Sequence, residues 1–370
     1  VNAGRVLADP RLGRVTATID GNADFGGGLN TEADAELHIA DATFDSYTYS
    51  DVTLSASLHD RTLVADLGSN DPNATLRLNI EGSDKDGDTH LAIDCDIDRL
   101  APHTLNLLGA YPTYALRGKV RAEAQGTNAD NATGRVEVSG LSFVPDSADA
   151  GSPLNIRRLN AELTRSAGHA LLQIDSDVLR GKVEGTISPS TLAATLRDMA
   201  SHTLPALLAH DDRLHERISR GEGANDFDFS FTLADAEGLS RFLKLPVTVI
   251  YPISIDGQVS SSTGKAYALV DAPYLQQGDK IIEATVVQAS LDTSSDRADV
   301  YATTRMPTKK GPMTAVVDVS GADNRFDTTI DWLIDRKATS ILTALRESPL
   351  MPWGTIIPDW YRRFKSRCPS

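Results

Sequence analysis

Two sets of carboxylates and one pair of histidines are the residues whose type and spacing could do chemistry. Asp84, Asp86 and Asp88 alternate as the first ligands of a calcium-binding loop do. The sixth and twelfth positions of that loop require Gly and Glu, and here they hold Thr89 and Cys95. A solvated hairpin turn therefore explains the three aspartates better than a calcium site.

The other polar groups also lack a catalytic arrangement. Asp94, Asp96 and Asp98 alternate along one expected strand, so a solvated strand face competes with glycosidase-type acid/base chemistry, and we favour the solvated face. His210 and His215 are five residues apart, a spacing that does not place two metal ligands on one helix face. The sequence therefore predicts no enzymatic activity, no cofactor and no metal.

Composition narrows the class of protein further. The chain has 370 residues, a formal net charge of −15, 41% hydrophobic residues and 6% aromatic residues. This acidic balance argues against a nucleic-acid partner, because phosphate neutralisation needs clustered Lys and Arg. No stretch approaches 18 uninterrupted apolar residues, so we expect no membrane-spanning helix inside the chain. The two cysteines, Cys95 and Cys368, exclude a disulfide scaffold, and we expect Cys95 to be a packed thiol on an apolar strand face.

The dominant pattern is period-2 alternation of apolar and polar residues, which is typical of half-buried strands. It recurs in residues 75–81, 90–97, 119–123, 134–138, 182–187, 226–233, 253–259 and 315–319. Gly, Asp, Asn and Ser separate these runs, and the Gly/Asp-rich residues 82–88 indicate a hairpin turn. The sequence therefore predicts consecutive strands in antiparallel order.

Strands with one apolar face need an apolar cover, and the sequence indicates which kind. A sandwich or closed barrel would bury the faces against protein, but aromatic residues and long helices to fill such a core are few. We therefore predict an all-β fold: an elongated, repetitive antiparallel sheet curled into an open groove, β-taco or solenoid-like, with a few short helices. Globular sandwiches remain the alternative.

Short helices and composition divide the chain. Apolar residues at three- and four-residue spacing predict helices over 189–199 and 235–243, and 98–108 could form a third. The polar segment 209–225 indicates a loop or boundary. We expect β-groove repeats over 1–188, a helical and loop insertion over 189–224, further β-groove repeats over 225–338, and an atypical basic tail over 339–370.

An open apolar face would be a binding surface for long aliphatic ligands. Exposing an acyl chain of about 15 methylenes costs on the order of 12 kcal/mol, at about 0.8 kcal/mol per methylene, and an apolar groove removes this barrier without any catalytic group. The alternative, equally weighted, is that these aliphatic side chains only contact one another. The candidate lining residues are Leu76, Leu78, Ile80, Leu91, Ile93, Ile97, Phe227, Phe229, Phe231 and Leu233.

Several motifs, in a fixed order and spacing, resemble TamB proteins of Bacteroidota. Residues 41–54, DATFDSYTYSDVTL, resemble the family unit Phe-x-Tyr-x-x-Tyr-x-Tyr-x-x-Ile-x-Leu. As in the family, an Asn-Asp-Pro-Asn turn follows, at residues 70–73, and then an alternating strand. Residues 173–185, 225–247 and 323–332 resemble later units. The resemblance covers roughly residues 5–338.

The resemblance implies a function that alternation alone does not. TamB-like proteins belong with AsmA-like, bridge-type lipid-transfer proteins, which are anchored in the inner membrane by an N-terminal helix and cross the periplasm as a long β-groove. They partner an Omp85-type outer-membrane barrel and are associated with phospholipid movement and outer-membrane protein assembly. By this resemblance we expect a periplasmic location and phospholipid acyl chains as cargo. We also expect that the anchor and the barrel-contacting domain lie outside this chain, which would then be a truncated internal fragment.

Two further functions are alternatives to phospholipid transfer. A scaffold could template nascent outer-membrane strands at its sheet edges without lipid cargo. A surface β-solenoid adhesin is the other, although adhesins normally use aromatic platforms and only 6% of this chain is aromatic. The family pattern stops near residue 338, and the tail beyond it holds Trp353 and Trp360. The tail is interpretable as a surface-lying basic segment, an amphipathic anchor on anionic lipid, or the product of a truncation or altered reading frame, which the resemblance favours.

Overall fold

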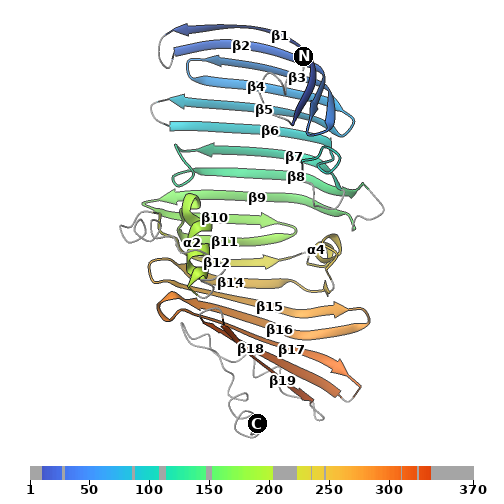
Figure 1. The fold of residues 1–370 in the computed structure, drawn as a ribbon, viewed down its shortest axis with the longest axis vertical. Helices are drawn as coiled ribbons and strands as arrows, with labels where there is room; N and C mark the ends of the chain where they lie inside the picture. Colours follow the sequence, from blue (N-terminus) through green and yellow to red (C-terminus); the bar gives the residue numbers. More distant parts are fainter. Residues whose placement is uncertain are drawn as a thin grey trace.

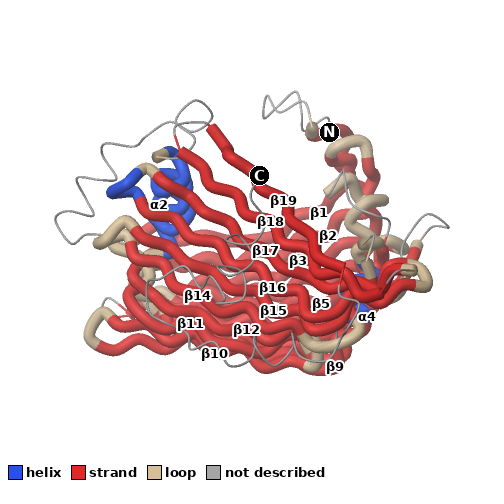
Figure 2. Tube along the Cα trace, turned by 90° about the horizontal axis from the view of Figure 1, so that it is seen from below, coloured by secondary structure: helices blue, strands red, loops and turns tan. Residues whose placement is uncertain are grey.

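One long antiparallel sheet accounts for nearly all of the described chain. The computed structural model describes residues 11–26, 30–85, 88–107, 114–146, 152–202, 223–234, 236–245, 247–309, 311–322 and 325–334. Within these ranges 19 strands form a single open sheet, with β1 at one end and β19 at the other (Figure 1). Seen along its long axis the sheet is an open, twisted trough (Figure 2). The predicted elongated all-β fold with few helices is therefore confirmed.

Most strands are joined to the next by a tight turn, so sequence order and spatial order nearly coincide. The exception is the two-residue β13, which pairs with β15, so that β12 pairs directly with β14. The strands are β1 (Leu12–Gly26), β2 (Asn30–Phe44), β3 (Tyr47–His59), β4 (Thr62–Asp71), β5 (Ala74–Lys85), β6 (Asp88–Leu100), β7 (Tyr114–Gln125), β8 (Thr133–Pro145), β9 (Leu154–Ser166), β10 (His169–Ser176), β11 (Leu179–Thr186), β12 (Asp226–Leu233), β13 (Thr248–Val249), β14 (Ile253–Ser260), β15 (Lys265–Gln277), β16 (Lys280–Asp292), β17 (Arg297–Thr308), β18 (Gly311–Ala322) and β19 (Arg325–Ile334).

Two of the three expected helices are confirmed. Helix α2 spans Pro189–Ser201 and helix α4 spans Ala236–Phe242. A 3-10 turn, η1, spans Thr293–Ser295. The helix predicted over 98–108 is wrong, because β6 continues to Leu100, which pairs with Ala74 of β5. Turns follow over 102–106 and bury Leu105 completely.

The two helices mark the two long rims of the sheet, where the strands end (Figure 1). The rim beside α2 also holds the β7–β8 turn, residues 126–132, and we call it the α2 rim. The opposite rim, beside α4, holds the β4–β5 and β10–β11 turns, and we call it the α4 rim. Because strands alternate in direction, every hairpin turn lies on one rim or the other.

A buried amide joins α2 to the sheet. Asn225 precedes β12 and is fully buried. Its Nδ2 donates to the hydroxyls of Thr191 and Thr195 at 3.1 and 3.0 Å, and its Oδ1 accepts from the backbone N–H of Ser188 at 2.9 Å. One side chain therefore satisfies polar groups at the start of α2 and along its first two turns, as a buried amide must.

Asp130 extends this contact along the rim. Its carboxylate accepts from the Ser188 hydroxyl at 2.9 Å and from the backbone N–H and hydroxyl of Ser190 at 3.0 and 2.6 Å. These hydrogen bonds, from Ser190 first, hold the pKa of Asp130 below its ordinary value. Because Asp130 belongs to the β7–β8 turn, the start of α2 is fixed to strands three and four places away from β11.

We expect Asn225→Ala to lower the free energy of unfolding by about 2 kcal/mol, because the buried Ser188 N–H and the buried Thr195 hydroxyl lose their hydrogen bonds to the amide. Urea unfolding followed by circular dichroism measures this loss. The matched control is Asn79→Ala, whose Nδ2 donates to Asp66 at an exposed site, and which we expect to change stability by under about 0.5 kcal/mol. Equal losses in the two variants would contradict the role given to Asn225.

Candidate functional site: the apolar face and its rims

All ten predicted groove residues lie on one face of the sheet. On β5 and β6, Ile80 pairs with Ile93 and Leu76 pairs with Ile97. Directly paired residues of adjacent strands share a face. The pairings therefore carry this face, strand by strand, to β12, which contributes its three phenylalanines and Leu233. We call it the apolar face and its opposite the polar face.

An unbroken row of apolar side chains and glycines crosses the apolar face. It passes through every strand except the short β13, one residue from each, and no polar side chain interrupts it. Its small residues escaped prediction, because an alanine or a glycine in a strand gives little alternation signal. The row is Gly21, Ala35, Ala56, Ala65, Ile80, Ile93, Ala122, Val136, Ala161, Ile174, Gly181, Phe231, Ile255, Val270, Val287, Ala302, Val317 and Ile330.

Three phenylalanine rings form an aromatic band on β12. The ring centroids of Phe227 and Phe229 are 6.3 Å apart, and those of Phe229 and Phe231 are 6.2 Å apart. Glycines face them on the neighbouring strands: a Cβ at Gly257 would collide with the Phe229 ring, and one at Gly181 with the Phe231 ring. The rings therefore lie over glycine backbone, so the aromatic band projects little above the apolar face.

The apolar face is not a closed core. Its central side chains are mostly half-buried, and Leu91 is 39% exposed. Fully buried apolar residues gather mainly at the rims, such as Leu105 and Tyr114 at the α4 rim and Ala170 at the α2 rim. Phe242 of α4 packs on Tyr114, with ring centroids 4.5 Å apart. Among the described residues no second sheet covers this face.

The polar face carries rows of charge instead. Arg121 pairs with Asp94 at 2.9 Å, and Arg158 pairs with Asp175 at 2.6 Å, both between neighbouring strands and both well exposed. A hollow of about 730 Å³ lies between the polar rows of β1–β6. Exposed pairs of this kind contribute little to stability. The charged side chains keep this face in contact with water. The apolar face remains for other contacts.

At the α4 rim, a buried carboxylate joins two of the motifs that carry the TamB resemblance. Asp71 of the Asn-Asp-Pro-Asn turn is 1% exposed. It accepts from the Tyr47 hydroxyl at 2.6 Å, from the Ser50 backbone N–H at 2.9 Å and from the Asn73 backbone N–H at 2.8 Å. Asn73 Nδ2 in turn donates to the Tyr47 oxygen at 3.1 Å. The tyrosine-rich strand and the turn that follows it are therefore one hydrogen-bonded clasp.

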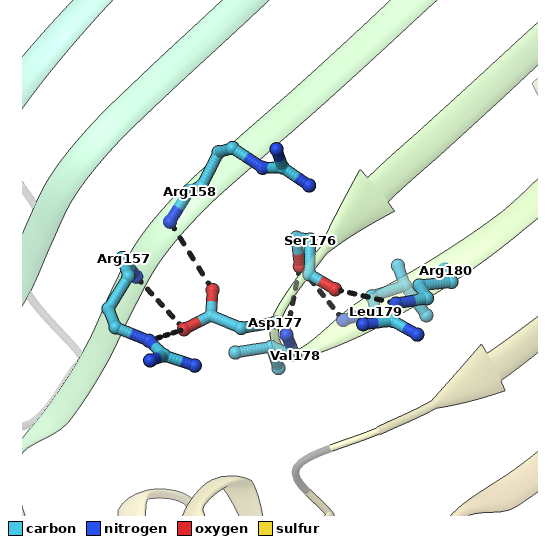
Figure 3. A network of polar contacts seen from close by, with 7 residues as sticks. All are labelled: Arg157, Arg158, Ser176, Asp177, Val178, Leu179 and Arg180. Atoms are coloured by element: carbon cyan, nitrogen blue, oxygen red, sulfur yellow. Dashed lines mark hydrogen bonds and ion pairs between the residues drawn. The ribbon is translucent and has the colours of Figure 1, made fainter.

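The β10–β11 turn repeats this arrangement further along the same rim (Figure 3). Asp177 accepts from the backbone N–H groups of Arg157 and Arg158 on β9, at 3.1 and 3.4 Å. The Ser176 hydroxyl accepts from the N–H groups of Val178 and Leu179, at 3.0 and 2.9 Å. In both turns a carboxylate reaches the backbone of the preceding strand, so each clasp fixes the register of three strands. The sequence shows the order and spacing of these motifs, but it contains no signal that their residues are in contact.

The residues considered for other chemistry are dispersed. Asp84 is paired with Arg61 at 2.6 Å, as a strand-end ion pair. Cys95 is half-buried on the apolar face, where burial first, and then Asp96 and Asp94, raise the pKa of its thiol. His210 and His215 lie outside the described residues. Where the chain is described, no three His, Cys, Asp or Glu side chains gather as metal ligands.

Similarity to known proteins does not identify a family for this chain. No protein-family model, curated protein or solved structure matches this chain. Within the described ranges, no helix has the length and apolarity needed to cross a membrane.

The Asp71 clasp predicts a pH-dependent stability. Burial by itself raises the pKa of Asp71, but the hydrogen bonds from Tyr47, Asn73 and Ser50 outweigh burial and lower it. Because the folded pKa lies below the unfolded pKa of about 3.9, the clasp stabilises the fold fully above that pH. Its contribution is lost as the pH falls through the folded pKa.

We therefore expect Asp71→Asn to reduce the free energy of unfolding by about 1–3 kcal/mol at pH 7. The difference from the wild type should shrink as the pH falls below the unfolded pKa of about 3.9 towards the lower folded pKa, because the contribution of the wild-type carboxylate is lost over that range. Urea unfolding at a series of pH values measures both. A difference that stays constant over this range would show that the carboxylate charge plays no part in the clasp.

Proposed function

We propose that this chain is a non-enzymatic segment of a TamB-like bridge, and that its apolar face holds phospholipid acyl chains. The observation that carries the proposal is the unbroken apolar row, which joins 18 strands without a described second layer above it. Contiguous apolar surface of this extent is unusual on a soluble protein, and it generally marks a binding site.

The energetics favour a long aliphatic ligand. Successive strands lie about 4.8 Å apart, so the row runs for roughly 80 Å along a flat sheet. Each methylene moved from water onto such a surface contributes about 0.8 kcal/mol. Small residues such as Ala122 and Ala161 separate the larger aliphatic side chains of the row, so no side chain of the row closes the path. An acyl chain could therefore slide from strand to strand without losing apolar contact.

The proposal also assigns the two faces of the sheet, one to the ligand and one to water. We propose that the apolar face lines the trough and that the polar face remains in water. Two observations support this assignment: Phe242 of α4 shields the α4-rim end of the apolar face, and ion pairs such as Arg121–Asp94 populate the polar face. A trough of this kind shields acyl chains and leaves lipid headgroups at its open side.

The remaining parts of the proposal come from the motif resemblance. By it, the chain acts in the periplasm, an inner-membrane anchor and an Omp85-type outer-membrane barrel partner complete the bridge, and phospholipid passes between the two membranes. Assembly of outer-membrane proteins is the associated role. The two clasps, at Asp71 and Asp177, support the resemblance, because they give its motifs a shared structural task.

A strand-templating scaffold is the second candidate, and one observation favours it. Within the described chain, β1 and β19 each pair with one neighbour, so each presents a backbone edge. β19 also exposes Phe326, Ile330 and Trp332. Such an edge can take up an incoming strand. Crosslinks from the edge backbone to unfolded barrel strands, unaffected by the polarity of the apolar face, would favour this function.

We expect Phe229→Asp to weaken acyl-chain binding at least tenfold, because it removes an aromatic contact worth about 1.5–3 kcal/mol and places a charge in the middle of the face. The measurement is native mass spectrometry of the chain after expression in a Gram-negative periplasm, with extraction of bound lipid. Titration with a fluorescent phospholipid gives the dissociation constant.

The matched control is Thr232→Asp. Thr232 lies on the same strand but on the polar face, where it pairs with Arg180 and Ser254. The control should keep lipid and the same β-sheet circular dichroism. Lipid that survives in Phe229→Asp, or a wild-type chain that is folded but never carries lipid, would overturn the conduit and turn attention to the strand-templating scaffold.

A further inference from the structure

The two end strands of the sheet are exposed on both faces. β1 and β19 lie at opposite ends of the long axis (Figure 1), and within the described ranges each pairs with one neighbour. Every residue from 16 to 24 of β1 is exposed, and so is every residue of β19 except the half-buried Asp331. Large apolar residues are among them: Ile19 is 74% exposed, Ile330 58% and Trp332 65%. All three lie on the apolar face, so each edge offers apolar side chains beside its backbone.

The backbones of the two edges fit one another as an antiparallel pair. Neighbouring strands alternate in direction, and the apolar row crosses an even number of strands, so β1 and β19 run in opposite directions. Hydrogen-bonded and non-hydrogen-bonded pairs also alternate along such a row. The N–H and C=O groups of Gly21 and Ile330, which end the row, are therefore both directed outward or both inward. A second copy placed end to end, rotated only by the twist of the sheet, would continue the sheet with the same faces and rims.

One register also matches the side chains of the two edges. It places Ile330 opposite Ile19, and on the apolar face every partner that β1 supplies is Ala, Gly, Ile or Val. On the polar face it places Arg325 opposite Asp24 and opposes no two like charges. The pairs of this register are Arg325–Asp24, Phe326–Ala23, Asp327–Asn22, Thr328–Gly21, Thr329–Asp20, Ile330–Ile19, Asp331–Thr18, Trp332–Ala17, Leu333–Thr16 and Ile334–Val15.

The charges of the two edges favour this register over its neighbours. A shift of two residues is the smallest that keeps each side chain on its face. In one direction this shift places Asp331 opposite Asp20, and it also places Asp327 opposite Asp24. In the other direction it places Asp327 opposite Asp20. Like charges directly opposite one another destabilise a pair of strands. The edges therefore specify a partner strand and its register, with Arg325 and Asp24 as the one pair of opposite charges.

We propose that β19 of one copy pairs with β1 of a second copy, so that molecules of this chain assemble end to end into a longer sheet. The backbone hydrogen bonds of the new pair supply the affinity, and the side chains fix the register. The contact is heterologous, since it joins two different edges, and each added copy presents a new free edge. The apolar faces of joined copies are continuous. This inference does not rest on the proposed function, because it holds whether or not lipid binds.

Two variants, each with one blocked edge, test the pairing. Ile19→Asp places a charge on the β1 edge and Ile330→Asp places one on the β19 edge, both at exposed positions. Sedimentation velocity over a concentration series measures association, at about 0.15 M salt to screen the net charge of −15 on each copy. We expect wild-type oligomers that lengthen with concentration and monomers of each variant alone. An equimolar mixture of the two variants should form a dimer and nothing larger, because each variant keeps one intact edge.

A matched control and a charge exchange complete the test. Ile281→Asp changes an exposed isoleucine of the inner strand β16 and should assemble as the wild type does. Arg325→Asp opposes two acids and should weaken association several-fold, whereas Arg325→Asp combined with Asp24→Arg exchanges the charges and should restore it.

Three results would overturn the proposal. The first is a wild type that stays monomeric at every concentration, and the second is a mixture of Ile19→Asp and Ile330→Asp that does not associate. The third is self-association of Ile19→Asp alone, which would show a two-fold pairing of β19 with β19 instead. Circular dichroism of each variant confirms that the sheet itself is kept.

Discussion

Register is the constraint on which the rest of this structure depends. Side chains alternate between faces with a period of two, so a slip of one residue in any pairing would move every apolar residue of a strand into water. A row that stays apolar from Gly21 to Ile330 requires that no such slip accumulates over the length of the sheet. The clasps at Asp71 and Asp177 hold turn and preceding strand together at the α4 rim, and Asp130 and Asn225 do the same for α2 at the other.

The distribution of burial follows from the single layer. A sandwich places its core between two sheets, whereas here the fully buried apolar side chains are found mainly where a helix or a turn folds over a strand end, as at Leu105 and Met199. Between the rims, stability comes from backbone pairing and from cross-strand contacts, each worth about 0.2–1 kcal/mol. Between the rims, no described element covers the middle of the apolar face.

The sequence revealed the periodic part of this molecule and little of the rest. Alternation predicted the open sheet and placed residues such as Ile80 and Phe229 on one face, because a period of two is a local property. The rims depend on contacts between distant residues, such as Ser188 with Asp130, for which a single sequence contains no signal. Residues 98–108 were misread because the end of β6 and a buried turn share helical spacing.

The nearly sequential strand order also determines how such a molecule can change in length. Each hairpin contacts little beyond its two neighbours, so inserting one complete hairpin would extend the sheet by about 9.6 Å while every later strand kept its direction, its face and its rim. Inserting a single strand between β8 and β11 would place α2 on the rim opposite to Asp130 and break their contact. The length of such a sheet can therefore change in steps of one hairpin, about a nanometre each, to match a fixed gap.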